Sequence, residues 1–139
     1  MSYKILGKYI KEMNFKIPNP KTFFLLSKNI SNYKINIDIK SDQIKEKIIE
    51  IQTTLNLHTE NEETEKINTK IVFSTIIELS DELTDKKEIE KIILIKIPTQ
   101  IYPELRKIFI LVFESSGFKE IKISDKVDFQ KLYDLRKVQ

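Results

Sequence analysis

Cysteine, glycine and histidine are the scarce residues of this chain, and their scarcity limits its chemistry. Among 139 residues there is no cysteine, one histidine (His58) and two glycines (Gly7 and Gly117). Without cysteine the chain can form no disulfide and no thiolate metal site, and it has no cysteine nucleophile. Two isolated glycines cannot build the GxGxxG or GxxxxGK[ST] loops that bind nucleotide phosphates.

The remaining catalytic side chains form no recognisable constellation. His58 is one short of a histidine-pair metal site, and a single histidine does not by itself indicate a Ser–His–Asp triad. We interpret it as a surface residue near a hairpin tip. Carboxylates are abundant but stand beside lysines, as in KEKIIE and DKKEIEK, so solvated ion pairs are the simplest interpretation. The sequence therefore predicts no enzyme, no metal site and no cofactor.

Long apolar runs are also missing. The densest one, Ile108–Phe113, has six residues, far fewer than the roughly 20 that span a bilayer. The opening MSYKILGKYI lacks the apolar core and small-residue cleavage site of a secretory signal. We expect one soluble, cytoplasmic domain covering residues 1–139, with no membrane insertion.

Charge is plentiful but balanced, with 24 basic and 21 acidic residues and a net charge of +3. Nucleic-acid-binding proteins usually gather basic residues on one face. Here both signs are mixed within the same short segments, for example ENEETEK, so the sequence does not favour a nucleic-acid partner.

The first half of the chain alternates apolar and polar residues with period two, which is typical of half-buried antiparallel strands. In the first such segment Tyr9, Met13 and Phe15 are expected on one face. The polar stretch HTENEETEK predicts a flexible hairpin tip between the third and fourth strands. The segment around Phe23–Leu26 predicts a crossover loop with an apolar knuckle. The four expected strands cover residues 9–17, 33–40, 49–57 and 67–79.

The second half changes to helical spacing. Asp85 with Glu88 predicts a capping box at the start of a helix that Pro98 ends. Pro103 suits the first turn of a second helix, and Gly117 suits its C-terminal cap. A short last helix is expected to start near residue 128. Four strands followed by helices predict an α+β fold.

The second of these helices is more apolar than one sheet requires. On a helical wheel, one arc holds the core-facing residues, whereas Ile110 and Leu111 fall among the charges of the opposite side. These two residues predict a subunit interface, with the helix packed between layers. The alternative is that they are two scattered exposed apolar residues, which are common. The core-facing arc consists of Ile101, Leu105, Ile108, Phe109, Val112 and Phe113.

Apolar residues outside that helix suggest a binding surface. The face of the second strand that carries Tyr33, Ile35, Ile37 and Ile39, together with the knuckle Phe23–Leu26, exceeds what one short terminal helix would cover. Exposed apolar patches of this kind mark sites for peptides or proteins. The alternative is that the knuckle folds back into the core.

Three segments also follow the sequence pattern of a known family, in the same order and over nearly the full length. YIKEMNFKIPNP is similar to Y-x-K-D-[IL]-S-F-E-x-P-x-x-P, and IPTQIYPELR to C-P-x-x-[IL]-F-P-[YF]-A-R. GFKEIKISDKVDFQKLY is similar to G-F-P-P-L-x-L-x-P-[VI]-[ND]-F-x-x-L-Y, with one extra residue before Val127. On these segments the chain resembles the SecB family of bacterial protein-export chaperones.

The resemblance implies a four-stranded antiparallel sheet followed by a helical layer, assembled as a dimer of dimers with the long helices between two eight-stranded sheets. It implies ATP-independent binding of unfolded secretory precursors and their delivery to the SecA motor. The groove is expected on the outer strand faces, flanked by the knuckle and the last helix: Phe23, Phe24, Leu25, Leu26, Tyr33, Ile35, Ile37, Ile39, Phe129 and Tyr133. The subunit interface is expected to include Tyr9, Ile101, Leu105, Ile108, Ile110 and Leu111.

The chain departs from the family where the family docks SecA. Glu12 keeps one acidic docking position, but lysine replaces an acid at Lys16 and Lys70, and the acidic C-terminal tail is missing after LRKVQ. We therefore expect weak SecA docking. Three alternatives remain: a SecB-like chaperone dedicated to one client such as an antitoxin, an oligomeric interaction protein without chaperone activity, and a small α+β enzyme.

Overall fold

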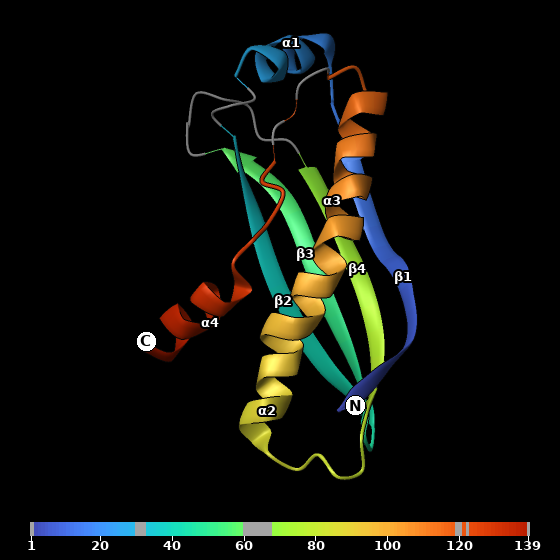
Figure 1. Cartoon of the computed structure of the whole chain (residues 1–139). Helices are drawn as coiled ribbons and strands as arrows, with labels where there is room; N and C mark the ends of the chain where they lie inside the picture. Colours follow the sequence, from blue (N-terminus) through green and yellow to red (C-terminus); the bar gives the residue numbers. More distant parts are fainter. Residues whose placement is uncertain (1, 30–32, 60–67, 119–120, 122, 139) are drawn as a thin grey trace.

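A computed structural model describes residues 2–29, 33–59, 68–118, 121 and 123–138, and these residues form a sheet with helices on one face (Figure 1). The described sheet has four antiparallel strands in the order β1-β4-β3-β2, so β1 and β2 are its edges. This arrangement confirms the predicted α+β fold. The strands are β1 (Tyr3–Lys16), β2 (Tyr33–Lys45), β3 (Ile48–Thr59) and β4 (Asn68–Leu79).

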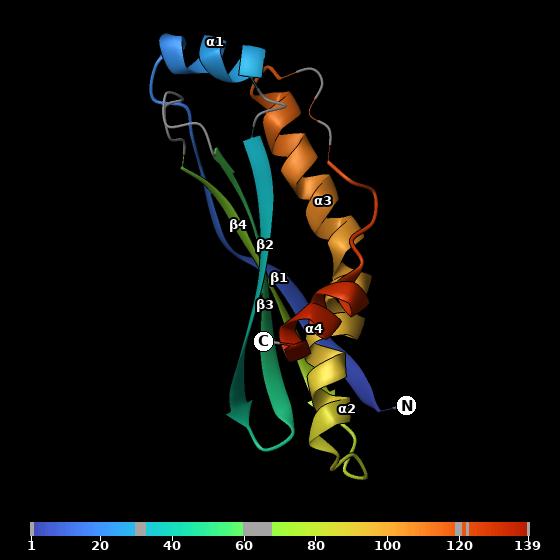
Figure 2. The same cartoon turned by 90° about the vertical axis from the view of Figure 1, so that its left-hand side faces the viewer.

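The alternation of the two central strands places their apolar residues under the helices. Ile51 and Leu55 of β3 and Ile71 and Ile77 of β4 are almost completely buried. Their neighbours along each strand point to the other face, which the helical layer leaves uncovered (Figure 2). The predicted hairpin tip between these strands lies outside the described residues, except for its first two positions at the end of β3.

The prediction that Tyr9 shares a face of β1 with Met13 and Phe15 is wrong, because a bulge lies between them. Tyr9 pairs with Ser74, whereas Met13 pairs with Ile71, and Ser74 and Ile71 lie on opposite faces of the sheet. The register shifts between Ile10 and Glu12 because β1 holds one extra residue there. A bulge reverses the side to which every later residue points, so Tyr9 does not share a face with Met13 and Phe15.

One continuous helical stretch replaces the two helices expected around the prolines. It consists of α2 (Lys86–Lys91), a π-helical turn η2 (Ile92–Lys96) and α3 (Ile97–Ser115). The prediction that Pro98 ends a helix is therefore wrong. In the π turn Ile97 N–H bonds to the carbonyl of Ile92, five residues back. This wider turn displaces the carbonyls that a proline ring would otherwise strike, so Pro98 fits at the start of α3.

The two ends of this stretch are capped largely as the sequence predicts. The Asp85 carboxylate accepts a hydrogen bond of 2.9 Å from the Lys87 N–H. Gly117 has a φ of 100°, and the Phe118 and Gly117 N–H groups bond to the carbonyls of Phe113 and Glu114. This is a Schellman motif, completed by contact between the Phe113 and Phe118 rings, whose centroids are 5.6 Å apart.

The crossover expected as a loop is instead a helix, α1 (Pro20–Asn29). The Asn19 side chain caps it by accepting bonds from the Thr22 N–H at 2.8 Å and the Thr22 hydroxyl at 2.9 Å. Pro20 suits the first helical position because its missing N–H would have no partner there. α1 lies across one end of the molecule, beside the C-terminal end of α3 (Figures 1 and 2).

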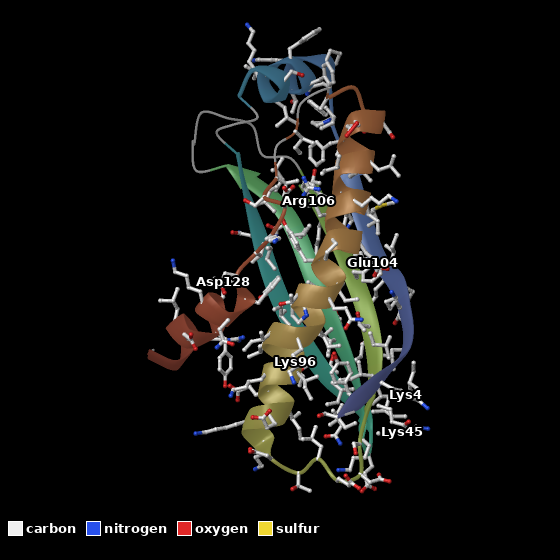
Figure 3. All side chains as sticks on the ribbon, viewed as in Figure 1. Lys4, Lys45, Lys96, Glu104, Arg106 and Asp128 are labelled. Carbon is white, nitrogen blue, oxygen red and sulfur yellow. The ribbon has the colours of Figure 1, made fainter. Side chains whose placement is uncertain are left out.

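The last element, α4 (Phe129–Val138), is tied to α3 through the segment before it. The helix starts where the sequence predicts it, and Asp128 caps it by accepting a bond of 2.9 Å from the Lys131 N–H. Arg106 of α3 donates to the carbonyl of Ile123 and lies 2.9 Å from the Asp125 carboxylate. Figure 3 labels Arg106 on α3 and Asp128 at the start of α4.

Candidate functional site

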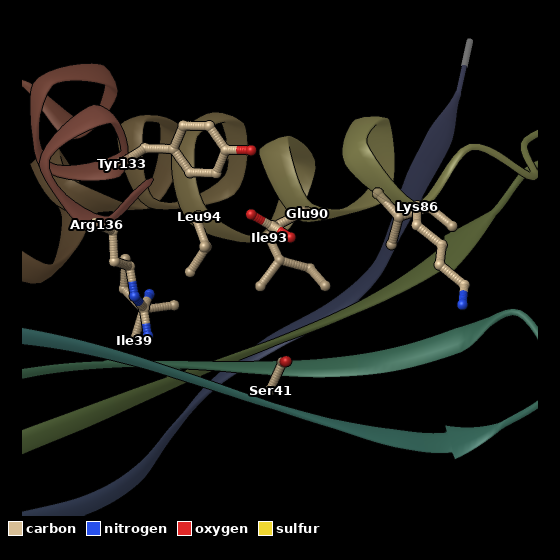
Figure 4. A pocket seen from close by; sticks show the side chains of 9 residues that line it. Ile39, Ser41, Lys86, Glu90, Ile93, Leu94, Tyr133 and Arg136 are labelled. Atoms are coloured by element: carbon tan, nitrogen blue, oxygen red, sulfur yellow. The ribbon is translucent and has the colours of Figure 1, made fainter. Parts of the chain in front are cut away.

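An open groove of about 650 Å³ lies between the edge strand β2 and the helical layer (Figure 4). β2 supplies its floor, the α2–η2 stretch supplies one wall, and α4 supplies the other. α4 extends past the β2 edge of the sheet, so the groove is bounded by an overhanging helix (Figure 1). Its lining residues are Ile39, Ser41, Lys86, Ile89, Glu90, Ile93, Leu94, Tyr133 and Arg136.

The groove is apolar at its centre and charged around it. Ile39 and Ser41 face the helices because every second residue of β2 points to that side. Ile89 and Ile93 are four residues apart and therefore share one helical face, and both are half-buried. Such a surface can bury apolar side chains of a ligand without a closed pocket.

Tyr133 joins the two helical walls of the groove. Burial raises the pKa of the Tyr133 hydroxyl, and a hydrogen bond to Glu90 raises it further. Tyr133 lies on α4 and Glu90 on α2, so this bond fixes the position of the overhanging helix (Figure 4). The Phe129 ring at the start of α4 packs against Tyr102 of α3, with centroids 6.2 Å apart.

The predicted groove residues of β2 lie near this site. They were expected on the outer face of the sheet, but they lie on the face that the helices cover. Ile35, Ile37 and Ile39 pair with Leu57, Leu55 and Thr53 of β3, which are buried beneath the helices. The three isoleucines are half-buried and face the helical layer, not the outer face. Only Ile39 lines the groove directly. The side chain of Tyr33 lies outside the described residues.

The remaining predicted groove residues divide between core and surface. Leu26 is completely buried and Phe129 is 2% exposed, so neither offers surface to a ligand. The prediction that these two residues line the groove is therefore wrong. Phe23 and Leu25 are half-buried, and Phe24 is 64% exposed. None of the residues Phe23–Leu26 lines the groove, because α1 lies at one end of the molecule.

The predicted interface residues also separate into two kinds. Ile101 and Leu105 are completely buried against the chain's own core, so they have no surface for another subunit and that assignment is wrong. Ile108 and Ile110 are half-buried, while Leu111 is 63% exposed. Tyr9 is exposed over 44% of its surface at the β1 edge.

Glu12 lies on the outer face of the sheet, in a polar depression. Its carboxylate lies 3.6 Å from the Lys70 ammonium and accepts a bond of 2.8 Å from Asn14. Lys11 and Lys40 line the same depression, so acidic and basic groups alternate there. Lys70 thus pairs with Glu12, the one acidic docking position that the chain keeps.

Glu50 is the residue that the sequence did not reveal. It is 6% exposed on the outer face, where its carboxylate accepts bonds from Ser74 at 2.7 Å, Tyr9 at 2.8 Å and Lys11 at 2.9 Å. These bonds, first those to Ser74 and Lys11, lower the pKa of Glu50 to about 2. Glu50 occupies a polar position of the β3 alternation, and nothing in the local sequence distinguishes it from an exposed glutamate.

Among the described residues, no three histidine, cysteine or acidic side chains gather as they would around a metal ion. Within the same residues no helix is both long and apolar enough to cross a membrane.

Comparisons with known proteins agree over nearly the whole chain. Residues 1–139 match the family described as "Preprotein translocase subunit SecB". A SecB relative from Pelagibacter ubique (strain HTCC1062) is 40% identical over 135 residues, covering 97% of this chain and 96% of the relative. The protein-export protein SecB of Anaplasma phagocytophilum (strain HZ) is 23% identical over 143 residues, covering 94% and 90%.

A solved structure has the same fold. A SecB-like chaperone of Mycobacterium tuberculosis, in complex with an antitoxin peptide, matches with a TM-score of 0.66 over 91% of this chain and 88% of its own. The sequences are 9% identical, so this likeness concerns the fold. On the family match and the relatives by sequence, this chain belongs to the SecB family of protein-export proteins.

Proposed function

We propose that this protein is an ATP-independent chaperone that binds unfolded secretory precursors and keeps them competent for export by the Sec pathway. The observation that carries the proposal is the open groove between β2, the α2–η2 stretch and α4. Its floor and wall present half-buried aliphatic side chains, which suit an extended segment with apolar residues. The SecB relatives share nearly the whole chain and are export proteins.

Binding requires no cofactor and no covalent step. An unfolded segment buries its apolar side chains in the groove, at roughly 25 cal/mol for each Å² removed from water. One groove of this size binds weakly. Several grooves on one assembly bind one long chain together, and effective concentration makes the sum tight. Proteins that fold slowly keep such segments exposed for longer and are therefore held preferentially.

Assembly as a dimer of dimers belongs to the same proposal. β1 is an edge strand with exposed Tyr9, Ile10 and Met13, and such an edge can pair with a second copy. Leu111 is exposed on α3, far from the groove lining. Two separate apolar surfaces support two kinds of subunit contact.

Delivery to SecA is the weaker part of the proposal. The Glu12 carboxylate is paired with Lys70, and Lys40 lies in the same depression. A basic partner surface would meet a charge-balanced face here, so we expect SecA docking to be weak or to use other contacts.

Two further candidates from the sequence are less well supported. The antitoxin-bound chaperone shares only 9% identity, whereas the relatives by sequence are export proteins, so a chaperone dedicated to one antitoxin is not favoured. An interaction protein without chaperone activity would not need the groove.

A refolding assay tests the proposal. An unfolded, slow-folding precursor is diluted into buffer without ATP, and its refolding is followed with and without excess protein. We expect the protein to retard refolding, and Ile93→Lys to weaken the retardation at least several-fold, because a charge at the groove wall opposes burial of apolar side chains.

Ile44→Lys is the matched control, since Ile44 is exposed on β2 and does not line the groove. It should retard refolding as the unchanged protein does. Refolding at the same rate with and without the protein would contradict the proposed function, and equal losses in the two variants would contradict the assignment of the groove.

A further inference from the structure

The charges around the groove point to a preference among client segments. Lys86 and Arg136 lie at opposite ends of the groove in Figure 4, with the aliphatic side chains of Ile93 and Leu94 between them. Lys86 comes from the start of α2 and Arg136 from α4, and Ile39 of β2 lines the same groove. A segment lying along the apolar centre would therefore meet a cation at either end.

Neither cation is neutralised within the described chain. Both residues are exposed, and neither forms an ion pair with another described residue. This sets them apart from Lys8, Lys11 and Lys70, whose ammonium groups contact Glu104, Glu50 and Glu12. Two unpaired cations beside an apolar surface leave two interactions for a ligand to make.

The acidic residue of the groove does not cancel them. Glu90 lines the same wall, but its carboxylate already accepts the hydrogen bond from the Tyr133 hydroxyl. The lining thus holds two cations and one anion, and the anion faces α4. A basic residue of a client would find one partly satisfied carboxylate and two repulsive charges, whereas an acidic residue would find two open partners.

We propose that the groove selects extended client segments whose apolar centre is flanked on both sides by aspartate or glutamate. This inference rests on the proposed chaperone function and names the substrate class of the same site. Apolar burial provides most of the affinity, and Lys86 and Arg136 determine which apolar segments are preferred. Screening by salt should weaken this preference while leaving the apolar contribution in place.

Three labelled peptides with one common apolar centre test the proposal. Their flanks are aspartates, serines or lysines, and binding is measured by fluorescence anisotropy at low and at high salt. Each exposed ion pair contributes a fraction of a kcal/mol, so we expect the aspartate peptide to bind about fivefold tighter than the serine peptide at low salt. The lysine peptide should bind more weakly than both, and the differences should shrink at high salt.

Charge-reversal variants separate the groove from the net charge of the protein. Lys86→Glu combined with Arg136→Glu should reverse the order of the aspartate and lysine peptides. Lys87→Glu combined with Lys131→Glu changes the net charge equally at exposed positions outside the lining, and it should leave the order unchanged.

The outcomes distinguish this proposal from the function on which it rests. Equal binding of the three peptides, or tighter binding of the lysine peptide, would overturn the preference and leave the chaperone function standing. The same change of order in both double variants would also overturn it, since net charge would then explain the effect. Binding of none of the peptides would overturn both.

Discussion

Glu50 shows how a single side chain can connect the edge of the sheet to its centre. It lies on β3 but bonds to Tyr9 and Lys11 of β1 and to Ser74 of β4. Lys11 stands at the β1 bulge, between Ile10 and Glu12. Regular pairing is interrupted at the bulge, and the bonds from Tyr9 and Lys11 to Glu50 hold the bulged residue and the strand before it against the sheet.

The low pKa of Glu50 makes part of the stability depend on pH. Because the pKa falls from 4.5 to about 2 on folding, the ionised carboxylate stabilises the folded state above pH 4.5. This contribution, on the order of 3 kcal/mol, is lost as the pH falls from 4.5 through 2. We expect Glu50→Gln to lower the free energy of unfolding at pH 7 by about 2 kcal/mol or more. The substitution removes the stabilising charge, and it leaves a buried polar group unsatisfied, which costs ~1–3 kcal/mol. Urea unfolding at pH 7 and pH 3 measures both effects.

Glu78→Gln provides the control, because the Glu78 side chain is 45% exposed and its ion pair with Lys4 is long, at 3.8 Å. Its unfolding curves should follow those of the unchanged protein at both pH values. If Glu50→Gln also lost as much stability as the unchanged protein between pH 7 and pH 3, the acid dependence would come from other groups.

At the scale of elements, the sequence predicts the regular parts better than the places where regularity is interrupted. Period-two alternation located all four strands, because the pattern is set by the side-chain period of a strand. The bulge near Lys11, the π turn before Pro98 and the cap at Asn19 each depend on one residue in its tertiary setting. Each was therefore missed, and each changes where side chains point.

The groove also combines residues that the sequence pattern indicates with residues that only the tertiary packing brings together. Ile39 of β2 was expected in a groove on the outer strand face, whereas the structure places it in the groove lining on the helical side. Ile89 and Ile93 belong to the segment that the sequence predicted as a helix from Asp85 to Pro98. The continuous α2–η2–α3 stretch places them opposite β2, which depends on packing and not on local pattern. The charged ends, Lys86 and Arg136, come from helices that meet only in the folded chain.

The cap of α1 yields a prediction at this scale. Asn19→Ala removes the acceptor of two hydrogen bonds from Thr22 and should destabilise α1 by about 1 kcal/mol. Hydrogen exchange of the α1 amides measures this, and protection there should fall about fivefold while protection in β3 and β4 remains. Asn19→Asp keeps an acceptor oxygen and should keep the protection. Equal exchange in Asn19→Ala and the unchanged protein would show that tertiary contacts alone hold α1.

At the scale of the whole molecule, the single chain divides its apolar surface into three regions. The groove beside β2 lies at one edge of the sheet, and the exposed side chains of β1 lie at the opposite edge. Leu111 projects from the layer of helices. If β1 joins two chains edge to edge, the groove edges remain at the outside of the combined sheet. Assembly then leaves binding surface free, which is what a chaperone with several grooves for one client requires.

Two distinct contacts predict distinct products when each is disrupted. Leu111→Lys places a charge on the exposed helix surface, and we expect it to halve the mass measured by light scattering, from four chains to two, with the β1 contact intact. Ile10→Lys combined with Met13→Lys places charge at the β1 edge and should also give pairs, joined instead through the helices. A four-chain mass in both variants would contradict this assignment of surfaces. Leu135→Lys, on the exposed side of α4, is the control and should keep the mass, because Leu135 lies in neither region.

If each pair binds a short peptide as the unchanged protein does but holds an unfolded precursor less tightly, tight holding depends on the number of grooves joined by assembly.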